Sequence, residues 1–576
     1  MDPQTLTDWI DTWATQRPND DAYIFYANTK DEPNRLTYYE LQRKAQALAQ
    51  ELKLYAQPGE RAVLLYPSGL EFVIALYACW YAGVIAAPCQ VPMNASGADK
   101  LTAIIDNCEP TFILSTSATQ AQIARSQTTQ WAQAHPLMQA FSQNDINLPT
   151  NSQWLNTDAL AHSTSTLTIT PFTADETALL QYTSGSTGTA KGVMLTQHNL
   201  IQNIQLLEHL YQREYSSRYI VSWLPLTHDM GLIGAMLHTT HGGGCLVFTS
   251  PQQFARRPWF WLTLMSRYQS EGTGAPPFGY ALCAHRLKTE HLENLGLSDW
   301  QYAMCGAEPI DPKVLRQFRN TLAPLGFHDD IFCPAYGLAE ATLLVSFNQG
   351  LETGQTIQTQ NLVNCGKPLQ SVCIVDPETH QPVKTGEPGE IWITGPCVGQ
   401  GYWNQPELTT ATFHAHLTDS KDNRYYLRTG DMGVMENDAL FIVGRRKESI
   451  IINGSNYYPA EIEPVIQQAH PALTQQTCIA FSASEADAPL VLLCELNKQT
   501  PDTEHRAIIQ AIATALYQHS QIRATAIGLL PRSSLPRTTS GKPQRLTCKQ
   551  ALQTNCLRTL FPDLIWHDTQ PSTAHA

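Results

Sequence analysis

The stretch that says most about this chain is YTSGSTGTAKG at residues 182–192, a loop rich in hydroxyl groups and glycines that contains Lys191. Glycines let backbone N–H groups converge on phosphate oxygens, and Ser and Thr hydroxyls with one ammonium add further donors. The stretch is not a Walker A loop, because Ala190 precedes Lys191 and Gly192 follows it, where that motif has glycine and then a hydroxyl. It predicts a polyphosphate-binding loop, although a flexible surface linker has a similar composition.

Composition indicates a globular protein of several domains, with 576 residues of which 43% are hydrophobic. The formal net charge of −14 argues against broad binding of nucleic acid, so we expect no nucleic-acid partner. The 14 cysteines form no CxxC pair, and many lie inside apolar runs, which is typical of reduced thiols. The acidic start of the chain shows no signal peptide, so the expected location is the cytoplasm.

One apolar segment, residues 72–87, resembles a membrane span because it carries no charge. It is slightly short for that role, and Gly83 is followed by a second apolar run. The pattern favours a buried helix that passes into a short buried strand, so no integral membrane segment is expected.

Helical patterns and short β-rich runs alternate over residues 35–115, which predicts a parallel sheet with helices on both faces. The alternation resumes after the phosphate loop, with strands expected near residues 219–223, 245–248 and 331–333. From Val372 on, β alternation predicts a small barrel or sheet. The sequence thus predicts a large N-terminal domain (1–445) with two parallel-type α/β subdomains and a small β-barrel-like subdomain. A hinge (446–449), a small mobile α+β domain (450–566) and a disordered tail (567–576) follow.

Four further motifs follow the phosphate loop in a fixed order: YGLAEAT at 336–342, YLRTGD at 426–431, GRRK at 444–447 and PRTTSGK at 536–542. Together these five motifs resemble those of the adenylate-forming superfamily, which contains acyl-CoA synthetases, peptide-synthetase adenylation domains and luciferases. Within it the chain is most similar to the fatty acyl-AMP ligases, through WLPLTHDMGL at 223–232, GAEP at 306–309 and NYYP at 456–459. The resemblance covers nearly the whole chain.

This resemblance implies an enzyme that converts a medium- or long-chain fatty acid and ATP, with Mg²⁺, into an acyl-adenylate and pyrophosphate. It further implies transfer of the acyl group to the phosphopantetheine arm of an acyl carrier protein. Many such ligases carry a longer insertion after YGLAEAT, associated with rejecting coenzyme A, whereas only residues 343–364 separate that motif from CGKP here. An acyl-CoA synthetase therefore stays open as an alternative, and a non-catalytic nucleotide-binding homologue is a second one.

The reaction brings two anions together, so catalysis depends on positioning and on stabilising negative charge at phosphoryl oxygens. By resemblance, Lys542 reaches the substrate carboxylate and the α-phosphate, and Glu340 holds Mg²⁺, a hard cation that takes carboxylate and phosphate oxygens. Spacing alone favours an exposed lysine after a turn for Lys542. For Glu340 the neighbouring residues favour the metal role over an N-cap or helix-surface carboxylate. His228 is expected to gate the passage between the nucleotide and acyl pockets.

For the nucleotide, the resemblance assigns the ribose hydroxyls to Asp431, whose carboxylate accepts hydrogen bonds, with Arg445 as a second contact. Tyr336 is expected to lie against the adenine, with the backbone after it and at 306–308 completing the pocket. Without the resemblance, Tyr336 is equally a core tyrosine, and Asp431 an ordinary turn aspartate. The full set of predicted nucleotide-binding residues is Thr183, Ser184, Gly185, Ser186, Thr187, Gly188, Lys191, Gly306, Ala307, Glu308, Tyr336, Gly337, Asp431 and Arg445.

The acyl chain is expected beside a predicted helix that follows His228 and Asp229. On that helix Met230, Gly231 and Gly234 would leave a groove, although close packing against the sheet explains the two glycines equally well. Glu448, just after GRRK, is predicted to be the hinge about which the C-terminal domain swings between the two half-reactions, and a plain linker residue is the alternative.

A rival enzyme class is suggested by His228–Asp229, which resembles half of a catalytic dyad, and by His241 with Gly242–Gly244, which resembles an esterase oxyanion loop. The chain contains no GxSxG nucleophile elbow. The sequence therefore disfavours an esterase.

Overall fold

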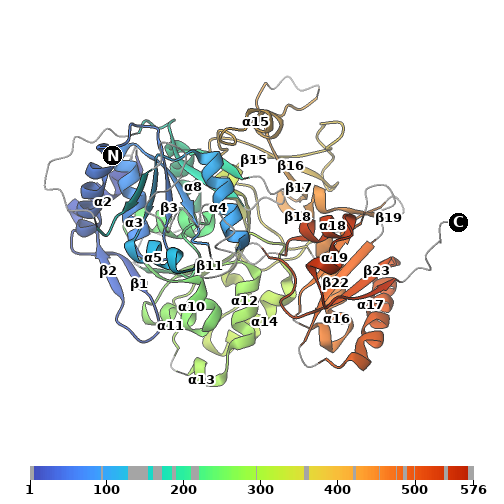
Figure 1. Ribbon diagram of the computed structural model, residues 1–576. Helices are drawn as coiled ribbons and strands as arrows, with labels where there is room; N and C mark the ends of the chain where they lie inside the picture. The colour runs from blue at the N-terminus through green and yellow to red at the C-terminus, as the bar shows by residue number, and fades with distance from the viewer. Residues whose placement is uncertain are drawn as a thin grey trace. The chain divides into compact units, whose positions relative to one another are not determined.

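The structure is a computed structural model (Figure 1), in which the chain folds into two compact units. The first unit runs to Phe441, and the second consists mainly of residues from Ile442 on, with Gly430–Gly433. The structure describes residues 5–92, 95–126, 153–159, 172–183, 190–208, 219–293, 295–355, 362–418, 423–452, 455–474, 476–483, 490–497, 500–537 and 543–568.

An eight-stranded sheet dominates the first unit, in the order β14-β13-β12-β11-β9-β10-β1-β2. Its interior pairings are parallel, and the edge strands β2 and β14 are antiparallel. The three strands predicted for this region are present, as β9, β10 and β13. The strands are β1 (Asp21–Tyr26), β2 (Asn34–Thr37), β9 (Tyr219–Ser222), β10 (Cys245–Thr249), β11 (Gly272–Ala275), β12 (Tyr302–Cys305), β13 (Phe332–Gly337) and β14 (Leu344–Phe347).

A second sheet has six strands in the order β6-β5-β3-β4-β7-β8, parallel except for the last pairing. The apolar segment predicted as a buried helix and strand is α3 (Leu70–Ala82) followed by β4, and its side chains are almost all buried. Among the described residues no helix is long and apolar enough to cross a membrane. The strands are β3 (Arg61–Leu65), β4 (Ile85–Cys89), β5 (Phe112–Ser115), β6 (Gln153–Asn156), β7 (Thr177–Thr183) and β8 (Lys191–Thr196).

Helices cover these sheets and bury an aromatic core under the eight-stranded sheet. Trp261 lies at its centre and contacts the rings of Trp223, Tyr280, Trp300 and Phe318. Burial of such large side chains is the main stabilising term of a core. The α-helices of this unit, with α3, are α1 (Leu6–Gln16), α2 (Tyr38–Lys53), α4 (Ala95–Cys108), α5 (Ser117–Ser126), α8 (Gln197–Glu208), α9 (His238–His241), α10 (Pro251–Arg256), α11 (Trp259–Arg267), α12 (Pro277–Arg286), α13 (Thr289–Leu292), α14 (Pro312–Leu322) and α15 (Pro406–Phe413).

The predicted small β subdomain is a four-stranded sheet, in the order β15-β16-β17-β18. Three of its strands match the predicted alternating runs. The fourth, β17, carries the YLRTGD motif and was not predicted, because glycine and charged residues interrupt its alternation. The strands are β15 (Ser371–Val375), β16 (Gly389–Thr394), β17 (Leu427–Glu436) and β18 (Ala439–Arg445).

The second unit is α+β, as predicted, with a mixed sheet in the order β21-β22-β23-β24. One face packs on α16 and α17, and the other on α18 and α19. Both faces are apolar because successive apolar side chains of a strand point to opposite faces of the sheet. Its last strand includes His567 and Asp568, which the sequence assigned to the tail. The elements are β19 (Ile450–Ile452), β20 (Ser455–Tyr457), α16 (Pro459–Ala469), β21 (Cys478–Ser482), β22 (Leu490–Leu496), α17 (His505–Ser520), β23 (Ala526–Pro531), α18 (Arg545–Gln553), α19 (Leu557–Leu560) and β24 (Ile565–Asp568).

Candidate active site

The strand order of the eight-stranded sheet changes direction between β9 and β11. From β9 the chain continues to β10 on one side, and then returns to β11 on the other. In open parallel sheets, ligands bind outside the carboxyl ends of the strands at such a switch point. The residues that follow β9, β12 and β13 belong to three of the predicted motifs, at 223–232, 306–309 and 336–342. The topology therefore brings these motifs to one edge of one sheet.

Glycines at this edge are required by close backbone contacts. A Cβ atom on Gly337 would lie 1.8 Å from the carbonyl oxygen of Leu343, and one on Gly306 would lie 2.8 Å from that of Ala335. Ala307 adopts the left-handed conformation, with φ of 68°. Tyr336, at the end of β13, is buried. The backbone of the predicted adenine pocket is thus tightly packed, and it leaves no room for a side chain at these two glycines.

The phosphate loop connects β7 to β8, which form an antiparallel hairpin. Thr183 pairs with Lys191 at the ends of the two strands, so the loop begins and ends at adjacent backbone positions. The predicted residues Ser184, Gly185, Ser186, Thr187 and Gly188 lie outside the described part of the chain.

Tyr402, which the sequence analysis missed, connects two predicted site residues. Its hydroxyl donates a hydrogen bond of 2.7 Å to Oε1 of Glu340, and the ammonium of Lys191 lies 5.4 Å from the centre of its ring. The backbone supports this arrangement, because the N–H of Gly399 donates to the Glu340 carbonyl and Tyr402 bridges to Val193 on β8. The lysine after the phosphate loop and the predicted metal-binding carboxylate therefore share one aromatic neighbour. The glycine-rich run before Tyr402 was the available sequence signal.

Glu340 is better suited to bind a magnesium ion that arrives with a nucleotide than to bind a metal ion coordinated by protein groups alone. The described residues contain no group of three or more His, Cys, Asp or Glu side chains that could hold a metal ion. Mg²⁺ commonly keeps several waters and takes one or two carboxylates together with substrate phosphates. A single carboxylate oriented by a tyrosine suits that mode.

His228 and Asp229 lie directly before a π-helix, η1 (Met230–Leu237). Nδ1 of His228 is 2.6 Å from Oδ1 of Asp229, and the same oxygen caps the helix by accepting the N–H of Met230. The predicted helix is thus present but of the rare wide type, which occurs frequently at functional sites. This contact fixes the orientation of the imidazole at the switch point.

The two glycines of η1 do not both line a groove. A Cβ on Gly231 would lie 2.3 Å from the carbonyl oxygen of Pro225, so close backbone packing accounts for this glycine. At Gly234 a Cβ would meet only the end of the Leu343 side chain, at 3.1 Å. The methyl group of Met230 lies 3.5 Å from the Cβ position of Gly274 on β11, so Met230 packs against that strand.

The loop that resembles an esterase oxyanion hole is covered by α1. Trp13 of this helix and Arg17, its C-cap residue, donate hydrogen bonds to the carbonyl groups of His241 and Gly243. The side chain of His241 packs edge-on against Trp9 and lies 2.7 Å from Glu208. Since these contacts occupy the loop, it serves to hold α1.

In the second unit, two predicted ribose-binding residues lie together. Nε of Arg445 is 3.2 Å from Oδ1 of Asp431, whose side chain is only 9% exposed whereas that of Arg445 is 62% exposed. Glu448 ends a 3₁₀ turn, η5 (Arg446–Glu448), between β18 and β19. Lys542 lies outside the described residues.

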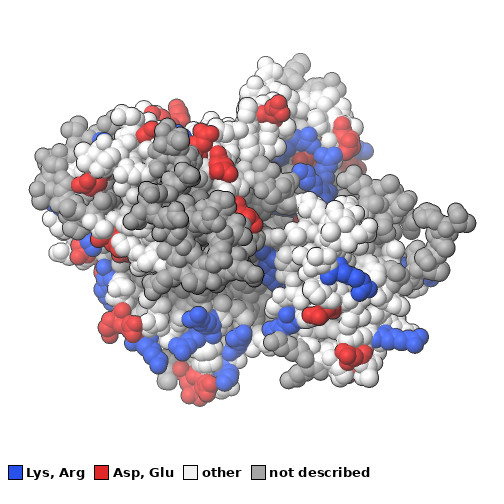
Figure 2. All heavy atoms as spheres, in the orientation of Figure 1, with Lys and Arg blue, Asp and Glu red and all other residues white. Residues whose placement is uncertain are grey.

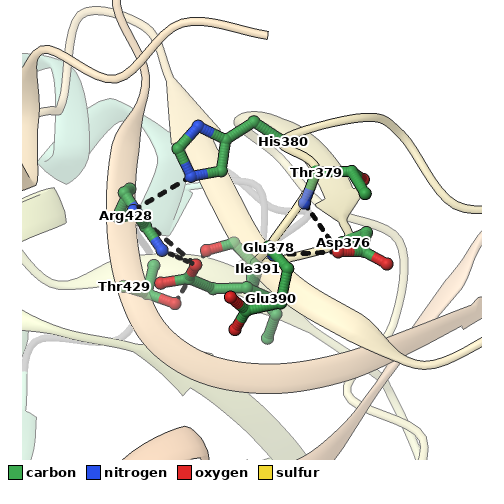
Figure 3. A network of polar contacts seen from close by, with 8 residues as sticks. All are labelled: Asp376, Glu378, Thr379, His380, Glu390, Ile391, Arg428 and Thr429. Carbon is green, nitrogen blue, oxygen red and sulfur yellow. Dashed lines mark hydrogen bonds and ion pairs between the residues drawn. The ribbon is translucent and has the colours of Figure 1, made fainter. Parts of the chain in front are cut away.

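The arginine of the YLRTGD motif, Arg428, lies partly buried in a polar network (Figure 3). Arg428 donates to Oε2 of Glu390 from Nε and Nη2, at 3.2 and 2.7 Å, and its third nitrogen is 3.3 Å from Nε2 of His380. The hydroxyl of Thr429 donates to the carbonyl of Ile391. These contacts fix the start of β17 against β16, just before the motif reaches Asp431.

The sheet topology and the order of the motifs are those expected of an enzyme that activates carboxylic acids through adenylates, and comparison with known proteins shows this class. A sequence model described as AMP-binding enzyme matches residues 10–403, and one described as Disco-interacting protein 2-like, AMP domain, matches residues 447–560. The chain belongs to the AMP-binding enzyme family, within its fatty acyl-AMP ligases.

Two relatives and one solved structure align over nearly the full chain. Medium-chain-fatty-acid--[acyl-carrier-protein] ligase JamA of Moorena producens is 33% identical, over 95% of this chain and 94% of the relative. A 4-hydroxyphenylalkanoate adenylyltransferase of Mycobacterium marinum is 34% identical, over 96% and 91%. The crystal structure of the fatty acyl-adenylate ligase of L. pneumophila with acyl adenylate and pyrophosphate aligns with a TM-score of 0.72 and 31% identity, over 98% of both chains.

Proposed function

We propose that this AMP-forming ligase activates a medium- or long-chain fatty acid as its acyl-adenylate and transfers the acyl group to the phosphopantetheine of an acyl carrier protein in the cytoplasm. The observation that carries the proposal is the bridge of Tyr402 between Glu340 and Lys191, which joins a carboxylate and a cation beside the phosphate loop. The carrier-protein acceptor is supported by the name of the JamA relative.

In this proposal the chain's own groups orient and neutralise the reacting anions. Lys191 and the phosphate loop bind the phosphates, Glu340 holds Mg²⁺, and Lys542 neutralises charge between the fatty carboxylate and the α-phosphate. When bound, Mg²⁺ supplies positive charge to the phosphate oxygens. Asp431 and Arg445 bind the ribose, Tyr336 and the backbone at 306–308 hold the adenine, and His228, oriented by Asp229, gates the acyl pocket. Glu448 is the proposed hinge.

Acyl-CoA synthesis is the second candidate, because of the short segment after YGLAEAT. In the described part of that segment, β14 is followed by a bridge between Thr353 and Val363. An elaborate additional subdomain therefore has little room between β14 and Cys365. The short segment therefore bears on whether the acyl acceptor is a carrier protein or coenzyme A.

The acceptor is tested by offering preformed lauroyl-adenylate and enzyme to a holo carrier protein or to coenzyme A at equal thiol concentration. We expect a lauroyl thioester on the carrier protein at a rate at least tenfold above that with coenzyme A. The apo carrier protein is the control, because it lacks the thiol. Faster thioester formation on coenzyme A would favour the acyl-CoA synthetase.

Tyr402→Phe should weaken binding of MgATP by about tenfold, because a hydrogen bond to a charged carboxylate contributes roughly 1.5–3 kcal/mol. Phenylalanine keeps the ring that faces Lys191 and removes the hydroxyl that donates to Glu340. Calorimetric titration with ATP, with and without Mg²⁺, measures the effect. Tyr425→Phe, at a tyrosine that is 56% exposed, is the matched control. Equal losses with and without Mg²⁺ would count against a role of Tyr402 in orienting the metal ligand.

A further inference from the structure

Two buried carboxylates hold the chain on either side of residues 538–542. Before this segment, Arg537 lies 3.4 Å from Glu495, which also accepts the N–H of Leu535 at 2.8 Å. After it, Arg545 forms a fork with Glu463, with Nε to Oε1 at 2.9 Å and Nη2 to Oε2 at 2.7 Å. Bidentate pairs of this kind combine strength with fixed geometry.

The two flanks also pair directly with each other. Arg537 and Pro543 form a β-bridge, and Gln544 donates from its backbone to the carbonyl of Pro536 at 2.8 Å and from its side chain to that of Arg537 at 3.0 Å. Arg545 follows immediately. A displacement of Arg545 therefore moves the paired base of the segment with it.

The Glu463 end of the Arg545 contact is rigid. The Glu463 side chain is 13% exposed, and Oε1 also accepts the backbone N–H of Ala480 on β21 at 3.0 Å. Burial raises the pKa of this carboxyl, and the Arg545 guanidinium opposes that shift. With a fork and a backbone donor on one carboxylate, Arg545 is fixed to the core of the second unit.

The remaining nitrogen of Arg545 reaches the turn after GRRK. Nη1 lies 3.5 Å from Oε2 of Glu448, whose side chain is 36% exposed. The turn itself has a backbone bond from Ser449 to Arg446 at 3.2 Å, supported by the Ser449 hydroxyl at 2.9 Å. One guanidinium thus makes a short, buried contact on one side and a long, accessible contact on the other.

We propose that Arg545 is a positioning residue that latches the Glu448 turn. Glu463 fixes the guanidinium, and the Arg545–Glu448 contact holds the turn in one conformation and opens when the turn rotates. The part of this inference that links the turn to the change between half-reactions rests on the proposed function. The latch itself follows from contacts within the second unit.

The test uses Glu448→Gln in the full-length protein, because this change removes the charge from the exposed side and leaves the buried fork intact. Glu504→Gln is the matched control, since Glu504 also ends an exposed 3₁₀ turn, η7 (Asp502–Glu504), in the same unit. The first readout is the initial rate of tryptic cleavage in the Arg445–Lys447 stretch, where Arg445 and Lys447 are exposed. We expect cleavage about two- to fivefold faster in Glu448→Gln than in wild type, as for an accessible ion pair. High salt should abolish the difference.

Arg545→Lys completes a double-mutant cycle, because lysine keeps a charge for Glu463 but loses the fork that reaches both carboxylates. With a latch, Arg545→Lys accelerates cleavage in the wild-type background and adds little in Glu448→Gln. Additive effects, or cleavage in Glu448→Gln equal to that in the Glu504→Gln control, would overturn the proposal.

A second readout is the ratio of acyl-adenylate formation to acyl transfer, which should change at least twofold in Glu448→Gln and stay unchanged in Glu504→Gln. An unchanged ratio with faster cleavage would overturn the assignment of the turn to the half-reactions. If wild type itself forms no adenylate, the proposed function fails, while the cleavage rates still decide whether the latch exists.

Discussion

Lys542→Ala should lower fatty-acid-dependent exchange of pyrophosphate into ATP by about 10²- to 10³-fold. This is the size of effect seen when a single group that stabilises developing charge is removed from an active site. Because Lys542 is assigned to adenylate formation, transfer from preformed lauroyl-adenylate to a holo carrier protein should stay within a few-fold of wild type.

The control for this variant is Lys549→Ala, on α18 of the same unit. It removes a lysine seven positions further along the chain and should exchange pyrophosphate at the wild-type rate. Calorimetric unfolding of both variants checks that the fold is intact. Exchange at the wild-type rate in Lys542→Ala would remove the role assigned to this residue.

Glu463→Gln should destabilise the second unit by about 3 kcal/mol, because removing one partner of a buried ion pair leaves the other charge uncompensated. The expected value is at the lower end of the usual range, since Glu448 still lies 3.5 Å from Arg545. For a unit of this size the change corresponds to a fall of roughly 10 °C in the midpoint of thermal unfolding. Scanning calorimetry of the full chain measures it.

Glu504→Gln again serves as the comparison, because this exposed glutamate forms no buried pair in the described structure and should leave the midpoint unchanged. A midpoint of Glu463→Gln within 1 or 2 °C of wild type, on the scale of about 4 °C per kcal/mol, would mean that the fork contributes little to stability.

The sequence predicted the α/β architecture because hydrophobic periodicity marks strands and helices locally. The β-rich runs that became β3, β5, β10 and β16 are uninterrupted, and α3 followed by β4 is almost entirely apolar. β17 was not predicted because its motif contains glycine and charged residues. The place of Arg428 and Thr429 in the sheet is set by their hydrogen-bond partners Glu390 and Ile391. Such partners are distant in sequence, so local pattern does not reveal them.

The candidate site was likewise predicted only in part. Loop composition indicated Lys191, and the family resemblance indicated Glu340, Asp431 and Arg445. The structure places Asp431 beside Arg445. Tyr402 was missed because its role comes from contacts with β8 and with the turn at Glu340, which no spacing in the sequence encodes. Gly231 was assigned to a groove or to packing with equal weight, and the nearby Pro225 carbonyl supports packing.

Charged side chains of both signs lie on the surface of the described residues. On the face shown in Figure 2, the described Lys and Arg side chains are interspersed with Asp and Glu, without one broad basic field.

The central claim is that this chain transfers the AMP part of ATP to a fatty acid and releases pyrophosphate. ATP–pyrophosphate exchange with purified protein, Mg²⁺ and laurate tests it most directly. We expect exchange that requires both laurate and Mg²⁺, and that is lost in Lys542→Ala. Absence of exchange with every fatty acid from eight to eighteen carbons, in a protein that is folded by calorimetry, would contradict it.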